Sequence, residues 1–281
     1  MAPTPRTAAR SGVSPDLGID AVTRALAGAG CVAADEEAAE LLAAAGSTDE
    51  LAAMLARRLT GEPLAWITRS ARFCGIDVAI EPGVYVPRWQ SEPLARLGAR
   101  LLRDTGTAVD LCTGSGAIAM VLQTAHRRAR VVGTERDPIA VACARANGVD
   151  VFEGDLFDPL PVELESSVDV VTGVLPYVPS GAIRLLPRDV QQFEPRGALD
   201  GGPDGLDLLS VAIERSPRWL RPGGWLLLEA GGVQVESLRP VLAQARFDEV
   251  AALEDGDGDT RGLSARLSVS SRRAARGSVP W

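Results

Sequence analysis

Apolar residues in the first part of the chain recur at the spacing of helices. Between about residues 17 and 60, two groups repeat every three or four positions: Ile19, Val22 and Leu26, then Ala38, Leu41 and Leu42. Ser47-Thr48-Asp49-Glu50 supplies N-cap side chains for a third helix, Leu51–Leu59, which Gly61-Glu62-Pro63 ends. The pattern predicts a small helical domain over residues 17–62.

Shorter apolar segments follow this helical region. Leu64–Ile67 and Phe73–Ile80 are typical of short strands, and we predict that they pair as a hairpin. Glu81-Pro82-Gly83 predicts a turn after them. Residues 63–90 are therefore expected to form a β-hairpin linker.

From about residue 91 the pattern alternates between helices and strands. It predicts helices over residues 91–103, 116–124, 138–147, 206–220 and 233–245, and strands over 108–111, 130–134, 149–152, 168–172 and 225–229. Such alternation indicates an α/β fold with a doubly wound, mostly parallel sheet. Two last strands, 249–253 and 263–269, flank the turn-rich segment Asp255–Asp259 and predict an antiparallel hairpin at the sheet edge. We expect this domain to span residues 91–270.

The two ends of the chain lack such periodicity. Residues 1–16 are rich in Pro, Ser, Arg and Ala and are expected to be disordered, and residues 271–281 are expected to form a solvated tail. No apolar run reaches the roughly 20 residues of a membrane span, and no signal-peptide core opens the chain. We therefore expect no membrane partner and a cytoplasmic location.

Composition narrows the classes of protein further. Of the 281 residues, 46% are hydrophobic, which is enough for a sizeable core. A net charge of −8 argues against a nucleic-acid partner, because phosphate binding needs a basic face. The four cysteines are scattered and His126 is the single histidine, so neither a metal site nor a Ser-His-Asp hydrolase is expected.

A glycine-rich segment carries the clearest candidate chemistry. It lies between a predicted strand and a predicted helix, where Gly114 and Gly116 let the backbone turn tightly and approach a ligand. The free N–H groups at the start of the following helix add donors. The candidate cofactor-binding residues of this segment are Asp110, Thr113, Gly114, Ser115 and Gly116.

Acids follow at the ends of the next two predicted strands. Glu135 is placed to accept hydrogen bonds from ribose hydroxyls. Asp155 is placed to accept one from an adenine amino group, with Leu156 or Phe157 covering the ring. Open α/β sheets bind ligands at the carboxyl ends of their strands, so these acids favour a cofactor that contains adenosine.

Two common cofactors contain adenosine, NAD and S-adenosylmethionine. Ala119 stands where dinucleotide-binding loops usually carry a third glycine. Some dinucleotide folds tolerate alanine there, so the glycine-rich segment leaves both cofactors open. The loop after residues 168–172 decides for S-adenosylmethionine.

Several segments spread over most of the chain form a longer pattern: Gly61-Glu62-Pro63-Leu64, Val86-Pro87-Arg88 with Glu92, Asp110–Ala119, Pro176-Tyr177-Val178-Pro179, Phe193-Glu194-Pro195-Arg196 and Ala198–Asp207. Together they resemble the HemK/PrmC family of protein glutamine-N5 methyltransferases, and the chain looks most like a PrmC-related paralogue. The resemblance implies a class I S-adenosylmethionine-dependent methyltransferase domain with a small N-terminal helical substrate-recognition domain. It also implies that S-adenosylmethionine binds near Gly114, Gly116, Glu135 and Asp155.

Two segments depart from the family's pattern. The family's Asn-Pro-Pro-Tyr is here Val174-Leu175-Pro176-Tyr177, and its Arg-Pro-Glu/Asp-Thr-Glu is Arg88-Trp89-Gln90-Ser91-Glu92. The resemblance implies that the family's Asn accepts the hydrogens of the substrate amide and aims its lone pair. Val174 has no such acceptor, and a buried amide N–H left unpaired costs roughly 1–3 kcal/mol. We therefore expect weak or absent glutamine methylation, unless the backbone acceptors suffice.

The candidate catalytic residues are Val174, Leu175, Pro176, Tyr177 and Glu194, with Asp200 and Asp204 as further candidate bases. The candidate substrate-binding residues are Arg88, Trp89, Phe193 and Tyr177. An apolar pocket formed by Val174, Leu175 and Trp89 suits a flat or greasy substrate. Tyr177 can wall this pocket or attract the sulfonium by a cation–π interaction.

These residues predict a methyltransferase retasked to a small-molecule substrate, by alkyl transfer or by a ring closure that uses S-adenosylmethionine. Methylation of a protein glutamine, on a release factor or another protein, is the alternative. A non-catalytic S-adenosylmethionine-binding protein is a second alternative, and an NAD oxidoreductase a distant third. The sequence leaves the oligomeric state open.

Overall fold

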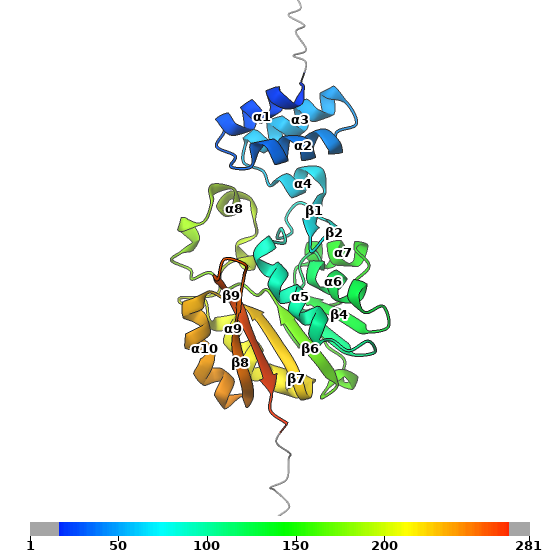
Figure 1. Ribbon diagram of the computed structural model, residues 1–281, viewed down its shortest axis with the longest axis vertical. Coiled ribbons are helices and arrows are strands. Elements are labelled where there is room, and N and C mark those ends of the chain that lie inside the picture. The colour runs from blue at the N-terminus through cyan, green and yellow to red at the C-terminus, as the bar shows by residue number, and fades with distance from the viewer. Residues whose placement is uncertain (1–16, 270–281) are drawn as a thin grey trace, which may run out of the picture. The chain divides into compact units, whose positions relative to one another are not determined.

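The computed structural model describes residues 17–269, and the chain divides into two compact units between Thr68 and Arg69 (Figure 1). The first unit is helical, and the second holds both sheets. The expectations for residues 1–16 and 271–281 lie outside the described residues.

The described part of the first unit consists of four helices: α1 Ile19–Gly28, α2 Ala34–Ala44, α3 Thr48–Leu59 and α4 Leu64–Thr68. The apolar residues at helical spacing meet in one core, where Val22, Leu26 and Leu41 are completely buried. The expected N-cap is confirmed, because the Ser47 hydroxyl accepts a hydrogen bond from the Glu50 backbone N–H at 3.2 Å.

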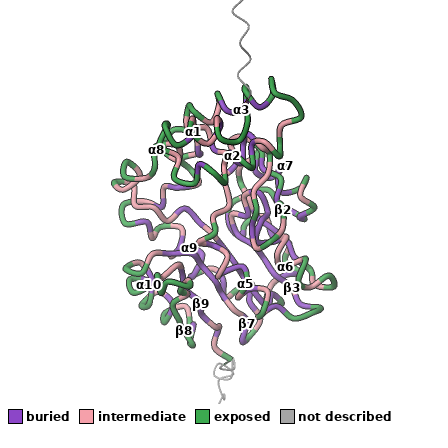
Figure 2. Tube along the Cα trace, turned by 45° about the horizontal axis from the view of Figure 1, so that its top comes forward, coloured by how far each residue is buried: buried purple, intermediate pink, exposed green. Residues whose placement is uncertain are grey.

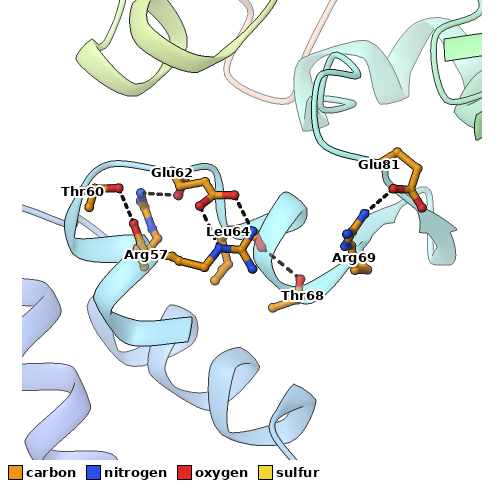
Figure 3. Close-up of polar contacts among 8 residues, drawn as sticks. Arg57, Thr60, Glu62, Leu64, Thr68, Arg69 and Glu81 are labelled. Atoms are coloured by element: carbon orange, nitrogen blue, oxygen red, sulfur yellow. Dashed lines mark hydrogen bonds and ion pairs between the residues drawn. The ribbon is translucent and has the colours of Figure 1, made fainter. Parts of the chain in front are cut away.

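The strand predicted over Leu64–Ile67 is wrong, because this segment forms α4. The Pro63 carbonyl accepts a hydrogen bond from the Trp66 N–H at 3.0 Å, which starts a helical turn. Figure 3 shows the segment just before it, where Glu62 binds Arg57 with an Nε–Oε2 distance of 2.9 Å. Periodicity alone does not separate a short apolar run in a strand from one in a buried helix.

The second unit begins with a two-stranded antiparallel hairpin, β1 Ser70–Phe73 and β2 Ile76–Ala79. Cys74 and Gly75 form its turn with positive φ angles of 49° and 82°. The predicted hairpin therefore exists, but its first strand lies later in the chain than expected. An ion pair between Arg69 and Glu81 lies at the base of this region (Figure 3).

A seven-stranded sheet is the centre of the second unit (Figure 1). Its strands are β3 Thr107–Leu111, β4 Arg130–Glu135, β5 Asp150–Glu153, β6 Val168–Gly173, β7 Leu220–Glu229, β8 Phe247–Glu254 and β9 Thr260–Leu267. Their order is β5-β4-β3-β6-β7-β9-β8. The first five in this order are parallel, and β9 is antiparallel to both β7 and β8. The doubly wound sheet with an antiparallel edge hairpin is confirmed.

The α-helices described in this unit are α5 Glu92–Leu101, α6 Ala117–Ala125, α7 Pro138–Ala146, α8 Arg188–Phe193, α9 Asp207–Trp219 and α10 Gly232–Gln244. Right-handed crossovers place α6 and α7 on one face of the sheet and α9 on the other, because the chain reverses its direction across the sheet between β5 and β6. α5 packs against α6, and α9 packs against α10. Sequence periodicity does not predict the short α8, and it starts β7 late, at Trp225 instead of Leu220.

The core follows from this arrangement. Every residue of β6 is buried, as expected for a central parallel strand covered on both faces. Figure 2 shows the middle of the sheet as buried, whereas β8 carries mostly exposed residues at the edge. Strand order reverses between β3 and β6, so the carboxyl ends of these two strands border a crevice where such sheets bind ligands.

Candidate functional site

A cavity of about 470 Å³ opens in the second unit at the carboxyl ends of β3, β4 and β6. Eight of the candidate residues line it: Asp110, Thr113, Gly114, Ser115, Glu135, Asp155, Val174 and Pro176. They come from segments spread over more than sixty positions, and the parallel strands bring their ends to one edge. The cavity therefore gathers the glycine-rich segment, the two following acids and part of the loop after β6.

The glycine-rich segment turns through left-handed backbone. Cys112, Gly114 and Gly116 have φ angles of 50°, 57° and 84°, and Gly116 is the N-cap of α6. A Cβ built on Gly116 would lie 2.7 Å from Cγ2 of Val149, so no side chain fits there without a shift. The Thr113 N–H donates to the Thr134 carbonyl at 3.0 Å and ties the loop to β4. The loop is thus held rigidly with its backbone close to the cavity.

Asp110 lies at the end of β3, buried and hydrogen-bonded. Its carboxylate accepts hydrogen bonds from the hydroxyls of Thr113 at 2.6 Å and Thr172 at 2.7 Å. Burial raises the pKa of Asp110 to about 6, and these hydrogen bonds oppose that rise. The side chain therefore links the glycine-rich segment to β6 and places a titratable group on the cavity wall.

Glu135 at the end of β4 is oriented by backbone donors. One oxygen accepts from the Gly114 N–H at 3.0 Å, and the other accepts from the N–H groups of Arg136 at 2.8 Å and Asp137 at 3.0 Å. An ionised carboxylate has about four acceptor sites, so capacity remains for a ligand hydroxyl. Asp137, which also lines the cavity, caps α7 by accepting from the Ile139 N–H at 2.8 Å.

The lining of the cavity fits an adenosine group. The carboxylates of Glu135 and Asp155 follow neighbouring strands, and both line the cavity as hydrogen-bond acceptors. Ile118, Pro138 and Leu208 add apolar surface suited to a flat ring. The residues present therefore match the ribose hydroxyls and the flat adenine ring of such a cofactor.

Leu156 and Phe157, expected to cover an adenine, lie in the hydrophobic core and do not line the cavity. The Phe157 ring stacks on Trp219 with a centroid separation of 6.0 Å and an interplanar angle of 8°. Leu156 has a φ of 47°, and this left-handed turn directs the segment after Asp155 inward. The sequence correctly predicts that these two residues follow the end of β5, but the prediction that they face the cavity is wrong, because they face the hydrophobic core.

Apolar residues also line the cavity, among them Val174, Pro176, Phe73 and Val84. Leu175 does not line it, because its side chain is buried against the glycine that ends β6. No charged side chain of the loop after β6 lines the cavity among the described residues.

Two hydroxyl-bearing residues, Tyr85 and Ser91, also line the cavity, and both were missed as site residues. Ser91 donates a hydrogen bond to Oε2 of Glu229, and the Tyr177 hydroxyl donates to Oε1 of Glu229 at 2.9 Å. Burial raises the pKa of Tyr177 and of Glu229. Glu229 was visible in the sequence only as an acid that ends an apolar strand.

Glu194 and Arg88 form an ion pair next to the cavity. The Arg88 guanidinium also lies over the Tyr85 ring, 5.3 Å from its centroid. Burial raises the pKa of Glu194, and the charge of Arg88 opposes this. Oε2 of Glu194 is buried without a hydrogen-bond partner among the described residues, and the following Pro195 lines the cavity.

The remaining candidates lie elsewhere. Phe193 ends α8 and does not line the cavity. Asp200 accepts a hydrogen bond from the Ser180 hydroxyl at 2.5 Å, and Asp204 accepts one from the Leu206 N–H at 3.0 Å. The structure thus uses both acids to hold the loop after β6 together.

Trp89 does not join Val174 in an apolar pocket. Its side chain is 58% exposed, and the Arg261 guanidinium lies 5.3 Å from its ring centroid. It lines a separate cavity of about 370 Å³ with residues of α5 and of the β8–β9 turn. The 3-10 turn Trp89–Ser91 brings Ser91 to the main cavity and leaves Trp89 outside it.

The chain resembles several known proteins over most of its length, although no family model matches it. It is 35% identical over 228 residues to the release factor glutamine methyltransferase of Geobacter sulfurreducens, which covers 78% of this chain and 79% of the relative. It is 35% identical over 274 residues to the enzyme of the same name from Mycolicibacterium smegmatis, covering 88% and 95%. It is 38% identical over 200 residues to the 4-amino-L-phenylalanine/4-methylamino-L-phenylalanine methyltransferase of Streptomyces pristinaespiralis, covering 67% and 68%.

The fold also matches solved structures. A methyltransferase from Pyrococcus furiosus superimposes with a TM-score of 0.51 at 18% identity, over 76% of this chain and 97% of that one. This similarity supports the class I methyltransferase fold of the seven-stranded sheet. Within the described residues, no helix is long and apolar enough to cross a membrane.

Proposed function

Because the chain belongs to the HemK/PrmC family of release factor glutamine methyltransferases and is an S-adenosylmethionine-dependent methyltransferase, we propose that its substrate is a small molecule with an apolar body and a nitrogen nucleophile. The observation that carries the proposal is Val174 on the cavity wall, at the position where the family has Asn. We favour this small-molecule substrate over the alternative, a glutamine side chain of a protein.

The part of the cavity around Glu135 and Asp155 is the proposed cofactor site. Glu135 would accept hydrogen bonds from the ribose, Asp155 from the adenine amino group, and the loop at Gly114 would face the rest of the molecule. When bound there, S-adenosylmethionine supplies an electrophilic methyl group. The protein's own task is to hold the nucleophile in line about 3–3.5 Å from the carbon and to exclude water.

The part of the cavity around Val174 and Pro176 is the proposed site of the nucleophile. An amide nitrogen is a poor nucleophile because its lone pair is delocalised, so it needs acceptors that orient its hydrogens. Val174 offers no side-chain acceptor, and a buried amide N–H left unpaired costs about 1–3 kcal/mol, or about 10- to 100-fold in rate. A primary arylamine keeps a more available lone pair and has a flat ring that suits the apolar surface of Val174 and Pro176.

A relative supports this choice of substrate. The Streptomyces pristinaespiralis enzyme is named for methylation of 4-amino-L-phenylalanine, a small aromatic amine. Its identity to this chain, 38%, is no lower than the 35% shared with two release factor enzymes. Descent from this family is therefore compatible with a small-molecule substrate.

Methylation of a protein glutamine is the second candidate. Two relatives at 35% identity carry the name release factor glutamine methyltransferase. The backbone carbonyls of Val174 and Leu175 remain as acceptors for an amide. This candidate predicts turnover of a release factor without any substitution in the loop.

We further propose that the helical unit contributes to substrate recognition and not to cofactor binding, because every residue that lines the main cavity lies after residue 68. We propose that residues 17–62 recognise the substrate, that residues 63–90 form the linker, and that residues 91–270 form the methyltransferase domain. A chain that starts at Arg69 should keep its affinity for S-adenosylmethionine and lose turnover. Loss of cofactor affinity in a folded truncated chain contradicts this division.

Product analysis tests the proposed function. Purified protein is incubated with S-adenosylmethionine and 4-amino-L-phenylalanine, and products are identified by mass spectrometry. We expect an N-methylated amine and one S-adenosylhomocysteine for each methyl group transferred. Turnover of a release factor with no methylation of the amine contradicts the proposal and favours the second candidate.

A further inference from the structure

The Ser91 hydroxyl has an unusual hydrogen-bond partner for a serine at a helix start. It is the N-cap of α5, where a serine hydroxyl usually accepts a hydrogen bond from the backbone N–H groups of the first turn. Its side chain makes no such bond here and donates instead to Glu229, which lies 138 positions later in the chain. The Ser91 hydroxyl therefore hydrogen-bonds a buried acid and does not cap the helix.

Glu229 is a buried carboxylate held by hydroxyls. It ends β7, is 3% exposed, and accepts hydrogen bonds from Ser91 and Tyr177 on its two oxygens. It forms no ion pair among the described residues, although Arg261 and Arg88 act on it electrostatically from a distance. Burial of this carboxyl group without an ion-pair partner raises its pKa, and a buried acid hydrogen-bonded to a residue of the cavity wall is a candidate for proton transfer.

Both ends of this hydrogen-bonded chain lie beside the proposed nucleophile site. Ser91 lines the same cavity as Val174 and Pro176, and Tyr177 follows Pro176 in the loop. Because the Ser91 hydrogen points to Glu229, the oxygen keeps its lone pairs for a hydrogen-bond donor. The cavity wall therefore offers one positioned acceptor for an N–H group, whereas orienting both hydrogens of a primary amide nitrogen needs two.

We propose that Ser91 accepts the N–H of the substrate nitrogen and that Glu229 receives the proton displaced by methylation. This inference rests on the proposed function, because it concerns the same cavity and the same reaction. The nitrogen lone pair forms the bond to the methyl carbon as the carbon–sulfur bond breaks and leaves its electron pair on sulfur. The proton of the methylated nitrogen passes to Oγ of Ser91 while the Ser91 proton passes to Oε2 of Glu229. Glu229 releases this proton to solvent when the product leaves.

This arrangement specifies the class of nucleophile. It requires a nitrogen that carries at least one hydrogen, so it accepts primary and secondary amines and rejects tertiary amines. Ser91 touches the substrate and is a catalytic residue in this scheme, whereas Glu229 acts through Ser91 as a positioning and proton-holding residue. The burial of Glu229 raises its pKa, which makes it a better proton acceptor than an exposed carboxylate.

A pair of substitutions at Ser91 tests the first step, with 4-amino-L-phenylalanine as the probe substrate. Ser91→Ala removes the acceptor and should lower kcat by about 10- to 100-fold. Ser91→Thr keeps a hydroxyl and is the matched control, which should lose less of kcat than Ser91→Ala. Both variants should bind S-adenosylmethionine with unchanged affinity by calorimetry.

The pH profile of kcat tests the role of Glu229. The wild type should lose activity as the pH falls through the raised pKa of Glu229, because only the carboxylate accepts the proton. Tyr177→Phe removes a hydrogen bond that lowers this pKa, so the acid limb should move to higher pH. Glu229→Gln keeps the shape of the side chain and should lose the part of the acid limb that Tyr177→Phe moves. Tyr85 and Tyr177 lie near Glu229, and neither ionises in this range. Asp110 lines the same cavity and has a pKa raised to about 6, so only the part of the acid limb that Tyr177→Phe moves is assigned to Glu229.

The outcomes separate this inference from the proposed function. Equal kcat for Ser91→Ala and Ser91→Thr overturns the inference, as does weaker S-adenosylmethionine binding by Ser91→Ala, which would make Ser91 a cofactor-site residue. If the wild type methylates a release factor and not the amine, the proposed function fails, and the same two variants assayed on the glutamine decide the inference. A protein that methylates neither substrate contradicts both.

Discussion

The part of the main cavity that we propose as its cofactor end and the part that we propose as its nucleophile end differ in how they are built. At the cofactor end, the carboxylates of Asp110 and Glu135 are fixed by hydrogen bonds from hydroxyls and backbone N–H groups, and Gly116 has no room for a side chain. At the nucleophile end, Val174 and Pro176 present apolar surface. A rigid site for the methyl donor lies beside a wall whose chemistry a single side chain, at position 174, can change. Such a methyltransferase can change its substrate while its cofactor site stays the same.

The strongest way to break the cofactor end is Gly116→Ala. Left-handed backbone costs about 1–2 kcal/mol for an L-residue and overpacking costs about 1–3 kcal/mol, and the new Cβ would lie 2.7 Å from Val149. We expect a loss of unfolding free energy of about 2–5 kcal/mol, measured by denaturant titration, together with loss of S-adenosylmethionine binding.

Gly148→Ala is the matched control for that substitution. Gly148 has a similar φ of 82° but nothing within 4 Å of a built Cβ. It should cost only the backbone strain of about 1–2 kcal/mol. Equal losses for both variants contradict the view that packing at the cofactor loop is tight.

Asp110→Asn tests the buried acid of the cofactor end. The pKa of Asp110 is raised from 3.8 to about 6, so its protonated form stabilises the fold below about pH 4 and this stabilisation is lost as the pH rises through 6. The unfolding free energy of Asp110→Asn minus that of the wild type should therefore increase from pH 4 to pH 7, by up to about 3 kcal/mol. Denaturant titrations at several pH values measure this difference, and a flat difference refutes the raised pKa.

Val174→Asn sharpens the contrast at the nucleophile end. It restores a side-chain acceptor for an amide, so methylation of a release factor glutamine should rise by about 10- to 100-fold. S-adenosylmethionine affinity should not change. Val174→Leu is the control, because it alters the size of the side chain without adding an acceptor. A similar gain from both variants means that pocket shape, and not the acceptor, limits glutamine methylation.

Glu135→Gln has the smallest expected effect. The amide NH2 replaces one carboxylate oxygen and faces either the Gly114 N–H or the N–H groups of Arg136 and Asp137, where a donor cannot bind. We expect S-adenosylmethionine affinity to fall by about tenfold, measured by calorimetry. Glu153→Gln, at the exposed end of the neighbouring β5, should leave the affinity unchanged. If both variants bind equally well, the ribose does not contact Glu135.

Much of the fold is predictable from the sequence because its periodic segments are long. The strands that end at Leu111 and Glu135 and the helix after Gly116 lie close to their expected positions. The segment Leu64–Ile67 is not predictable in the same way, since four apolar residues fit a strand and a buried helical turn equally well. Its neighbours in the helical core decide between the two.

The site is predictable where it depends on the ends of parallel strands and not where it depends on distant partners. Parallel strands bring Asp110, Glu135 and Asp155 to one edge, so their approach follows from the strand pattern alone. The hydrogen bond between Ser91 and Glu229 joins positions 138 residues apart, and nothing in local spacing reveals it. The exposed position of Trp89 likewise follows from a 3-10 turn that periodicity does not show.

A competition between two nucleophiles tests the central claim most directly. The purified wild-type protein receives S-adenosylmethionine with equimolar 4-amino-L-phenylalanine and a release factor whose glutamine is unmethylated, and mass spectrometry counts both products. We predict that the methylated amine forms at least about tenfold faster, as the missing acceptor at Val174 implies. Faster methylation of the glutamine would contradict the claim that this loop has turned from amides to a different nucleophile.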